Sequence, residues 1–77
     1  MDEKVKPGIY RHYKGNLYRV MGVGRHSETL EEFVVYIALY DGEFGKNSIW
    51  IRPLSMFLED VEVDGKKMPR FEFLKKE

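Results

Sequence analysis

The sequence predicts an all-β fold, a small and partly open barrel of five or six antiparallel strands. Short runs rich in β-branched and aromatic residues recur along the 77 residues. Glycine, asparagine and aspartate separate these runs about every ten residues, a spacing typical of antiparallel sandwiches and barrels. We expect the barrel to be of the SH3-like type, with an OB-like barrel as the alternative.

The first predicted element is a hairpin over residues 9–25, with a strand over 9–13. Its turn contains Gly15 and Asn16, which both tolerate positive φ. This turn leads directly into the second strand.

Two glycines interrupt that second strand, which covers residues 17–25. Gly22 and Gly24 are two positions apart and therefore lie on the same face. Glycine within a strand marks a bulge, a bend or the close approach of another backbone or a ligand. We interpret the pair as curvature that carries one strand from one sheet into the next.

The strongest strand signal lies over residues 33–40, which are all uncharged. One face would carry Phe33, Val35, Ile37 and Leu39, and the other Val34, Tyr36, Ala38 and Tyr40. Because both faces are apolar or aromatic, the strand is either central and covered twice or presents its tyrosines to a ligand.

The rest of the chain predicts three further strands. Pro53 ends the first because it cannot donate to a strand ladder, and Asp64-Gly65 is a strong hairpin-turn dipeptide. In order, we expect a polar loop over 25–32, a glycine-rich loop over 41–47, a strand over 48–52, a 3₁₀ turn over 53–57, and strands over 57–63 and 66–74.

Length and composition indicate a single domain over residues 1–77, with an ordered core over about 8–74 and frayed ends at 1–6 and 75–77. The chain has no cysteine, so its core must rely on five tyrosines, five phenylalanines and one tryptophan. No apolar run is long enough for a signal peptide or a membrane span. We therefore expect a cytoplasmic protein with no membrane contact.

A formal net charge of zero disfavours strong, sequence-independent binding of nucleic acid. The only histidines are His12 and His26, and no carboxylate has metal-ligand spacing with them. We expect no metal and no cofactor. His26, Ser27 and Glu28 are the residue types of a hydrolase site, but neighbours in one loop rarely converge as a triad. We therefore expect Glu28 or Ser27 to cap loop amides and His26 to pack or face solvent, and we expect no enzyme.

Aromatic residues and arginines predict a binding site. Small barrels use such residues to hold peptides, methylated ammonium groups or unstacked bases. We expect Arg52 to face this ligand or, as the slightly favoured alternative, to pair internally with Glu28 or Glu32. The predicted ligand-binding residues are Arg25, His26, Glu28, Tyr36, Tyr40, Trp50 and Arg52.

The function predicted from this site is that of a small non-catalytic binding module. Two alternatives stay open, namely an accessory domain that binds single-stranded RNA or DNA, and an interaction domain that pairs with a protein partner or a second copy through an edge strand. The tyrosines and Trp50 could also all belong to the core.

Several linked segments resemble those of the bacterial domain of unknown function 1653 family, over residues 8–73. They include the runs at 10–18, 25–31 and 50–53, together with Pro69-Arg70-Phe71. The resemblance implies an SH3-like β-barrel and brings no established activity. It marks as motif positions His12, Lys14, Gly15, Arg25, His26, Ser27, Glu28, Thr29, Tyr36, Tyr40, Trp50, Arg52, Pro53 and Arg70.

Overall fold

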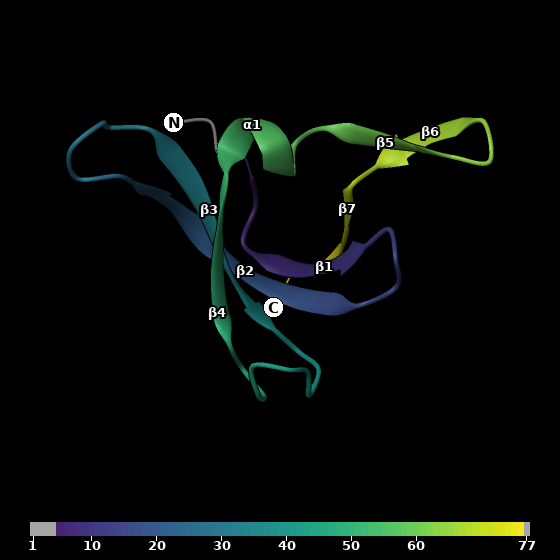
Figure 1. Cartoon of the computed structure of the whole chain (residues 1–77), viewed down its shortest axis with the longest axis horizontal. Helices are drawn as coiled ribbons and strands as arrows, with labels where there is room; N and C mark the ends of the chain where they lie inside the picture. Colours follow the sequence, from purple (N-terminus) through teal and green to yellow (C-terminus); the bar gives the residue numbers. More distant parts are fainter. Residues whose placement is uncertain (1–4, 77) are drawn as a thin grey trace.

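Five strands form one antiparallel, strongly twisted sheet in the computed structural model, which describes residues 5–76 (Figure 1). Their order across the sheet is β4-β3-β2-β1-β7, so β4 and β7 are the edge strands. The strands are β1 (Gly8–His12), β2 (Leu17–Arg25), β3 (Glu32–Ala38), β4 (Ile49–Pro53) and β7 (Phe71–Lys75).

A short helix and a hairpin connect β4 to β7. Helix α1 (Leu54–Phe57) is one turn long and buries Leu54 and Phe57 against the sheet. The hairpin of β5 (Asp60–Val63) and β6 (Lys66–Pro69) is a separate two-stranded sheet, and Figure 1 shows it projecting away from the main one. Within residues 5–76, no helix is long and apolar enough to cross a bilayer.

The all-β prediction is confirmed, with differences in detail. The described chain has seven strands rather than five or six, and its two sheets do not close into a barrel. The likeness to an SH3 barrel stays a prediction. The segment 53–57 holds one α-helical turn where a 3₁₀ turn was expected.

The strand predicted over 66–74 is divided at Arg70, and this division separates β6 from β7. The Arg70 backbone N–H donates to the Glu59 carbonyl at 3.1 Å, and the Arg70 carbonyl accepts from Tyr13 N–H at 2.9 Å. These bonds connect the base of the β5–β6 hairpin to the end of β1. The chain therefore leaves one sheet and enters the other at this residue.

The turns predicted at Gly15 and at Asp64-Gly65, and the curvature predicted at Gly22, are present. Gly15 has a φ of 108° in the first turn, and Asp64 and Gly65, at 51° and 78°, are both left-handed as a type I′ turn requires. The register of β2 against β3 shifts between Val20 and Gly22, so a bulge lies at the predicted curvature.

The core lies on one face of the main sheet, under α1. Tyr36 on β3 is only 4% exposed, and the opposite face of β3 is half-buried. The strand is thus fully covered on its tyrosine side only. The buried cluster consists of Val5, Tyr10, Val20, Val34, Tyr36, Leu54, Phe57 and Phe71, with Tyr18 and Trp50 packed against it.

Candidate ligand-binding site

His12 and Arg52 contact the Phe71 ring at the edge of this core, and Arg70, the residue before Phe71, lies near His12. We call these four residues the basic–aromatic cluster: His12, Arg52, Arg70 and Phe71. Phe71 is 6% exposed and stacks on Phe57, with ring centroids 4.3 Å apart. The His12 ring meets it edge-on at 4.9 Å. Elements far apart in the sequence, β1, β4 and the start of β7, supply these residues.

Arg52 is half-buried on the core face of β4. Its guanidinium carbon lies 5.6 Å from the centre of the Phe71 ring, a cation–π arrangement. Its Nε donates a hydrogen bond to the Tyr36 hydroxyl at 3.3 Å. The predicted ion pair with Glu28 or Glu32 is wrong, because no carboxylate within residues 5–76 contacts Arg52.

Arg70 lies between the β5–β6 hairpin and the main sheet. Its Nη2 is 3.4 Å from Oε1 of Glu59, and its side chain is 22% exposed. Its Nε is buried without a hydrogen-bond partner in the described chain. A buried donor that is left unpaired costs roughly 1–3 kcal/mol of stability.

His12 stands beside both arginines. Its Nδ1 accepts a hydrogen bond from the Lys14 backbone N–H at 3.2 Å, which places the proton of the neutral ring on Nε2. Burial lowers the pKa of His12, and the positive charges of Arg52, Arg70 and Lys14 lower it further. The cluster is therefore an electropositive place within a chain of zero net charge.

A chain of tyrosines extends from the cluster across the sheet. Tyr36 meets Tyr18 edge-on at 5.2 Å, and the Tyr18 and Tyr40 hydroxyl oxygens lie 3.0 Å apart. Burial raises the pKa of Tyr18, and its hydrogen bond with Tyr40 raises it further. The Tyr18 hydroxyl thus stays protonated at neutral pH.

Trp50 is half-buried on β4, opposite Tyr36 in the strand register. Its Nε1 donates to Ser48 Oγ at 2.9 Å, and Phe44 from the glycine-rich loop packs edge-on against it at 5.3 Å. One side of Trp50 therefore belongs to the core, while part of the ring is left at the surface.

The loop at residues 26–31 is closed by its own hydrogen bonds. His26 Nδ1 accepts from the backbone N–H groups of Glu28 and Thr29, at 3.1 and 3.2 Å. Arg25 donates to the Leu30 carbonyl at 2.9 Å, and Leu30 takes a left-handed φ of 66°. The loop amides are therefore capped by His26, and not by Glu28 or Ser27 as the sequence predicted.

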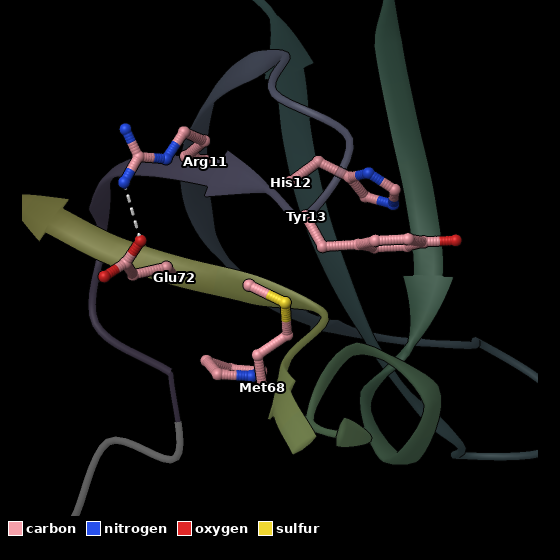
Figure 2. Close-up of a pocket in the computed structure, with 6 residues that line it drawn as sticks. Arg11, His12, Tyr13, Met68 and Glu72 are labelled. Carbon is pink, nitrogen blue, oxygen red and sulfur yellow. Dashed lines mark hydrogen bonds and ion pairs between the residues drawn. The ribbon is translucent and has the colours of Figure 1, made fainter. Parts of the chain in front are cut away.

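A pocket of about 210 Å³ lies next to the cluster and shares His12 with it. Figure 2 shows the neighbouring rings of His12 and Tyr13 on one side of it and Met68 on another. The ion pair of Arg11 and Glu72, at 2.9 Å, lies at its edge. The pocket is thus part apolar and part charged.

The structure brings together only some of the residues predicted for the site. Arg52 is bonded to Tyr36, and Tyr18 connects Tyr36 with Tyr40. Trp50 lies beside Tyr36 in the strand register. In contrast, the exposed loop residues Arg25, His26 and Glu28 have no described hydrogen bond or ring contact with them. Tyr36 is buried, so it supports Arg52 rather than offering a ring to a ligand.

Four residues of the arrangement were not among the predicted ligand contacts, namely His12, Tyr18, Arg70 and Phe71. The family motif was the only signal that marked His12 and Arg70, because nothing local in the sequence connects them. Among residues 5–76, no group of three or more histidine, aspartate or glutamate side chains is placed to hold a metal ion.

Comparisons with known proteins agree with this fold. A family profile described as a protein of unknown function (DUF1653) matches residues 8–73. The crystal structure of a DUF1653 protein from Bordetella bronchiseptica is similar, with a TM-score of 0.83 and 38% sequence identity over 94% of this chain and 90% of that one. A comparison with curated proteins finds no match. The chain belongs to the DUF1653 family, whose function is not established.

Proposed function

We propose that the chain is a small, non-catalytic binding module whose ligand contacts Arg52 at the basic–aromatic cluster. One observation carries this proposal. Arg52 is held in place by the Tyr36 hydroxyl and the Phe71 ring, while no acidic side chain of residues 5–76 neutralises it. A half-buried arginine that is positioned without a carboxylate partner is suited to a ligand that brings its own acceptor.

The hydrogen bonds of His12 and His26 support the non-catalytic part of the proposal. A general base needs a free ring nitrogen within reach of the nucleophile. His26 uses Nδ1 to accept from two backbone amides of its own loop, and His12 uses Nδ1 to accept from Lys14. Each histidine thus has a structural task that accounts for its position.

Buried rings count against the nucleic-acid alternative. Base stacking requires an accessible aromatic face. Tyr36 and Phe71 are 4% and 6% exposed, so bases could not stack on them without opening the core. Tyr40 and Trp50 are half-buried and Phe44 beside Trp50 is 68% exposed, so these rings would have to supply any stacking surface.

Fluorescence of Trp50, the only tryptophan, can test the proposal. The probes would be single-stranded RNA and DNA oligonucleotides and pools of random hexapeptides, each at low and at moderate salt. We expect saturable binding of at least one probe, weakened about tenfold or more in Arg52→Gln, because a hydrogen bond to a charged group contributes roughly 1.5–3 kcal/mol.

The matched control is Arg25→Gln, since Arg25 is also on a strand but donates to the Leu30 carbonyl and lies 3.9 Å from Glu32. It should bind the same probe as the wild-type chain does. Thermal unfolding of each variant would check that the fold is retained. Binding that is equal in Arg52→Gln and wild type, or absent with every probe, would overturn the proposal.

A second candidate function is edge-strand pairing, and the exposure of β4 favours it. Ile49 and Ile51 are 66% and 62% exposed, the highest values for any isoleucine or valine of the described chain. Both lie on an edge strand, next to the half-buried aliphatic residues Val35 and Ile37 of β3. An exposed apolar edge invites pairing with another strand.

A further inference from the structure

We propose that the basic–aromatic cluster recognises a single carboxylate of a peptide, which the free terminal guanidinium nitrogens of Arg52 would hold. This inference rests on the proposed function and specifies its ligand. The two terminal nitrogens of Arg52 are planar donors that make no hydrogen bond within residues 5–76, an arrangement that matches the geometry of a carboxylate.

The donors available at Arg52 are its terminal nitrogens. Nε is engaged with the Tyr36 hydroxyl at 3.3 Å, and neither Nη1 nor Nη2 makes a hydrogen bond within residues 5–76. Because Nε and the Phe71 ring fix the plane of the guanidinium, the two free nitrogens are already oriented. Binding a carboxylate would then cost little side-chain entropy, because the Arg52 side chain is already ordered.

Arg70 contributes positive charge rather than a direct contact. Its Nη2 is 3.4 Å from Glu59 Oε1, and its Nε is buried away from the surface. The charges of Arg52 and Arg70 both act on His12, whose pKa they lower. The field at the cluster therefore favours an anion.

The balance of charge favours one carboxylate over a phosphate dianion or a polyanion. Glu59 already faces Arg70, and Glu72 faces Arg11 next to the pocket. Those acidic groups would repel a second negative charge. Arg52 and Lys14 are left as cations with no described carboxylate contact, and Lys14 lies over the Tyr13 ring instead.

The neighbouring pocket argues for a peptide rather than a free small acid. It shares His12 with the cluster, and its wall includes the apolar side chains of Met68 and Pro69. Because His12 belongs to both, a carboxylate at the cluster would place the adjoining residue of a peptide near this pocket. We therefore expect an apolar side chain next to the acidic residue to strengthen binding.

The test is an NMR titration of the full chain that follows the Arg52 Nε–H and the His12 ring. Sodium acetate, sodium phosphate and sodium chloride would be added at equal ionic strength, followed by acetyl-Asp-Leu-amide and the matched acetyl-Asn-Leu-amide. We expect acetate, but not chloride, to move the Arg52 signal and to raise the pKa of His12, because an added negative charge favours the imidazolium.

The aspartyl peptide should bind more tightly than acetate and about tenfold or more tightly than the asparaginyl peptide, a loss typical of one charge-assisted contact. Arg52→Gln should remove this preference, while Arg52→Lys should retain part of it and Arg25→Gln all of it. Arg52→Lys keeps the charge, so it also controls for effects of the charge on folding.

The possible failures are distinguishable. If both peptides bind equally well, or phosphate moves the Arg52 signal and acetate does not, the carboxylate assignment is wrong while the proposed binding site stands. If acetate moves surface lysine signals as much as that of Arg52, the effect is nonspecific and the assignment is overturned. If no hexapeptide or oligonucleotide binds either, the proposed function also fails.

Discussion

Single residues in this chain take roles that their neighbours in the sequence do not explain. Arg52 follows an isoleucine and precedes a proline, yet its environment is Tyr36 from β3 and Phe71 from β7. His26 is the opposite case, since all of its described hydrogen bonds are within its own loop. Residues of the first kind are better candidates for ligand contact, because the fold, rather than a local turn, positions them.

His12 should make stability depend on pH. Its pKa in the folded chain is lowered from 6.5 by burial and by Arg52, Arg70 and Lys14, so the unfolded chain binds the proton more readily. The stabilisation from neutral His12 is present above pH 6.5 and is lost as the pH falls through the folded pKa. We expect the urea midpoint to decrease over this range.

The comparison variant is His12→Asn, whose side-chain oxygen can still accept from the Lys14 N–H. The difference between the two urea midpoints should shrink as the pH falls, since only the wild type loses stabilisation from His12. A constant difference between about pH 7.5 and about pH 5 would contradict this account. NMR titration of the His12 ring would measure its pKa directly.

At the scale of elements, the sequence predicted most of the strands, because their signals are local. The turns at Gly15 and Asp64-Gly65 and the bulge at Gly22 each depend on a residue that tolerates positive φ. The division at Arg70 was not predictable, since apolar residues continue on both sides of it. The Arg70 N–H still pairs with Glu59 of the hairpin, whereas its carbonyl already accepts from Tyr13, which is far away in the sequence.

The long-range nature of the contacts at the site also explains why the sequence did not predict all of its residues. Alternation showed that both faces of β3 are apolar but could not tell which face the helix covers. The structure places Tyr36 under α1 and Phe57, and leaves the aliphatic face partly open. The cluster itself combines residues from three separate segments, and no spacing in the sequence connects His12, Arg52 and Arg70.

The contact of β1 with β7 gives an element-scale prediction. A Cβ at Gly8, where φ is 150°, would lie 2.5 Å from the Lys75 carbonyl oxygen and 2.9 Å from the Phe73 ring. Gly22 has a similar φ of 154°, but a Cβ there meets nothing within 4 Å. Gly22→Ala should therefore cost about 1–3 kcal/mol of backbone strain alone.

Gly8→Ala should cost the same strain and roughly 1–3 kcal/mol more, because β7 must move to admit the methyl group. Urea unfolding of the two variants would give the difference, with Gly22→Ala as the matched control for φ. Equal losses of stability in both would mean that β1 and β7 do not approach this closely in solution.

At the scale of the whole molecule, the two edges of the main sheet differ. On β7, charged Glu72 and Lys75 interrupt the apolar residues, which is a common protection against edge pairing. On β4, Ser48 accepts a hydrogen bond from Ala38 N–H of β3, so by alternation the backbone groups of Ile49 and Ile51 point away from the sheet. The unprotected edge thus carries free donors and acceptors beside two exposed isoleucines.

This edge is self-complementary, because an antiparallel pair of β4 strands would place Ile49 of one copy opposite Ile51 of the other. We expect the chain, of 9.2 kDa, to show about twice that mass by light scattering at high micromolar concentration. Ile51→Lys should return it to a monomer, while Leu74→Lys on the opposite edge should not. A wild-type monomer at every concentration would exclude self-pairing and leave Arg52 as the principal candidate contact for a partner.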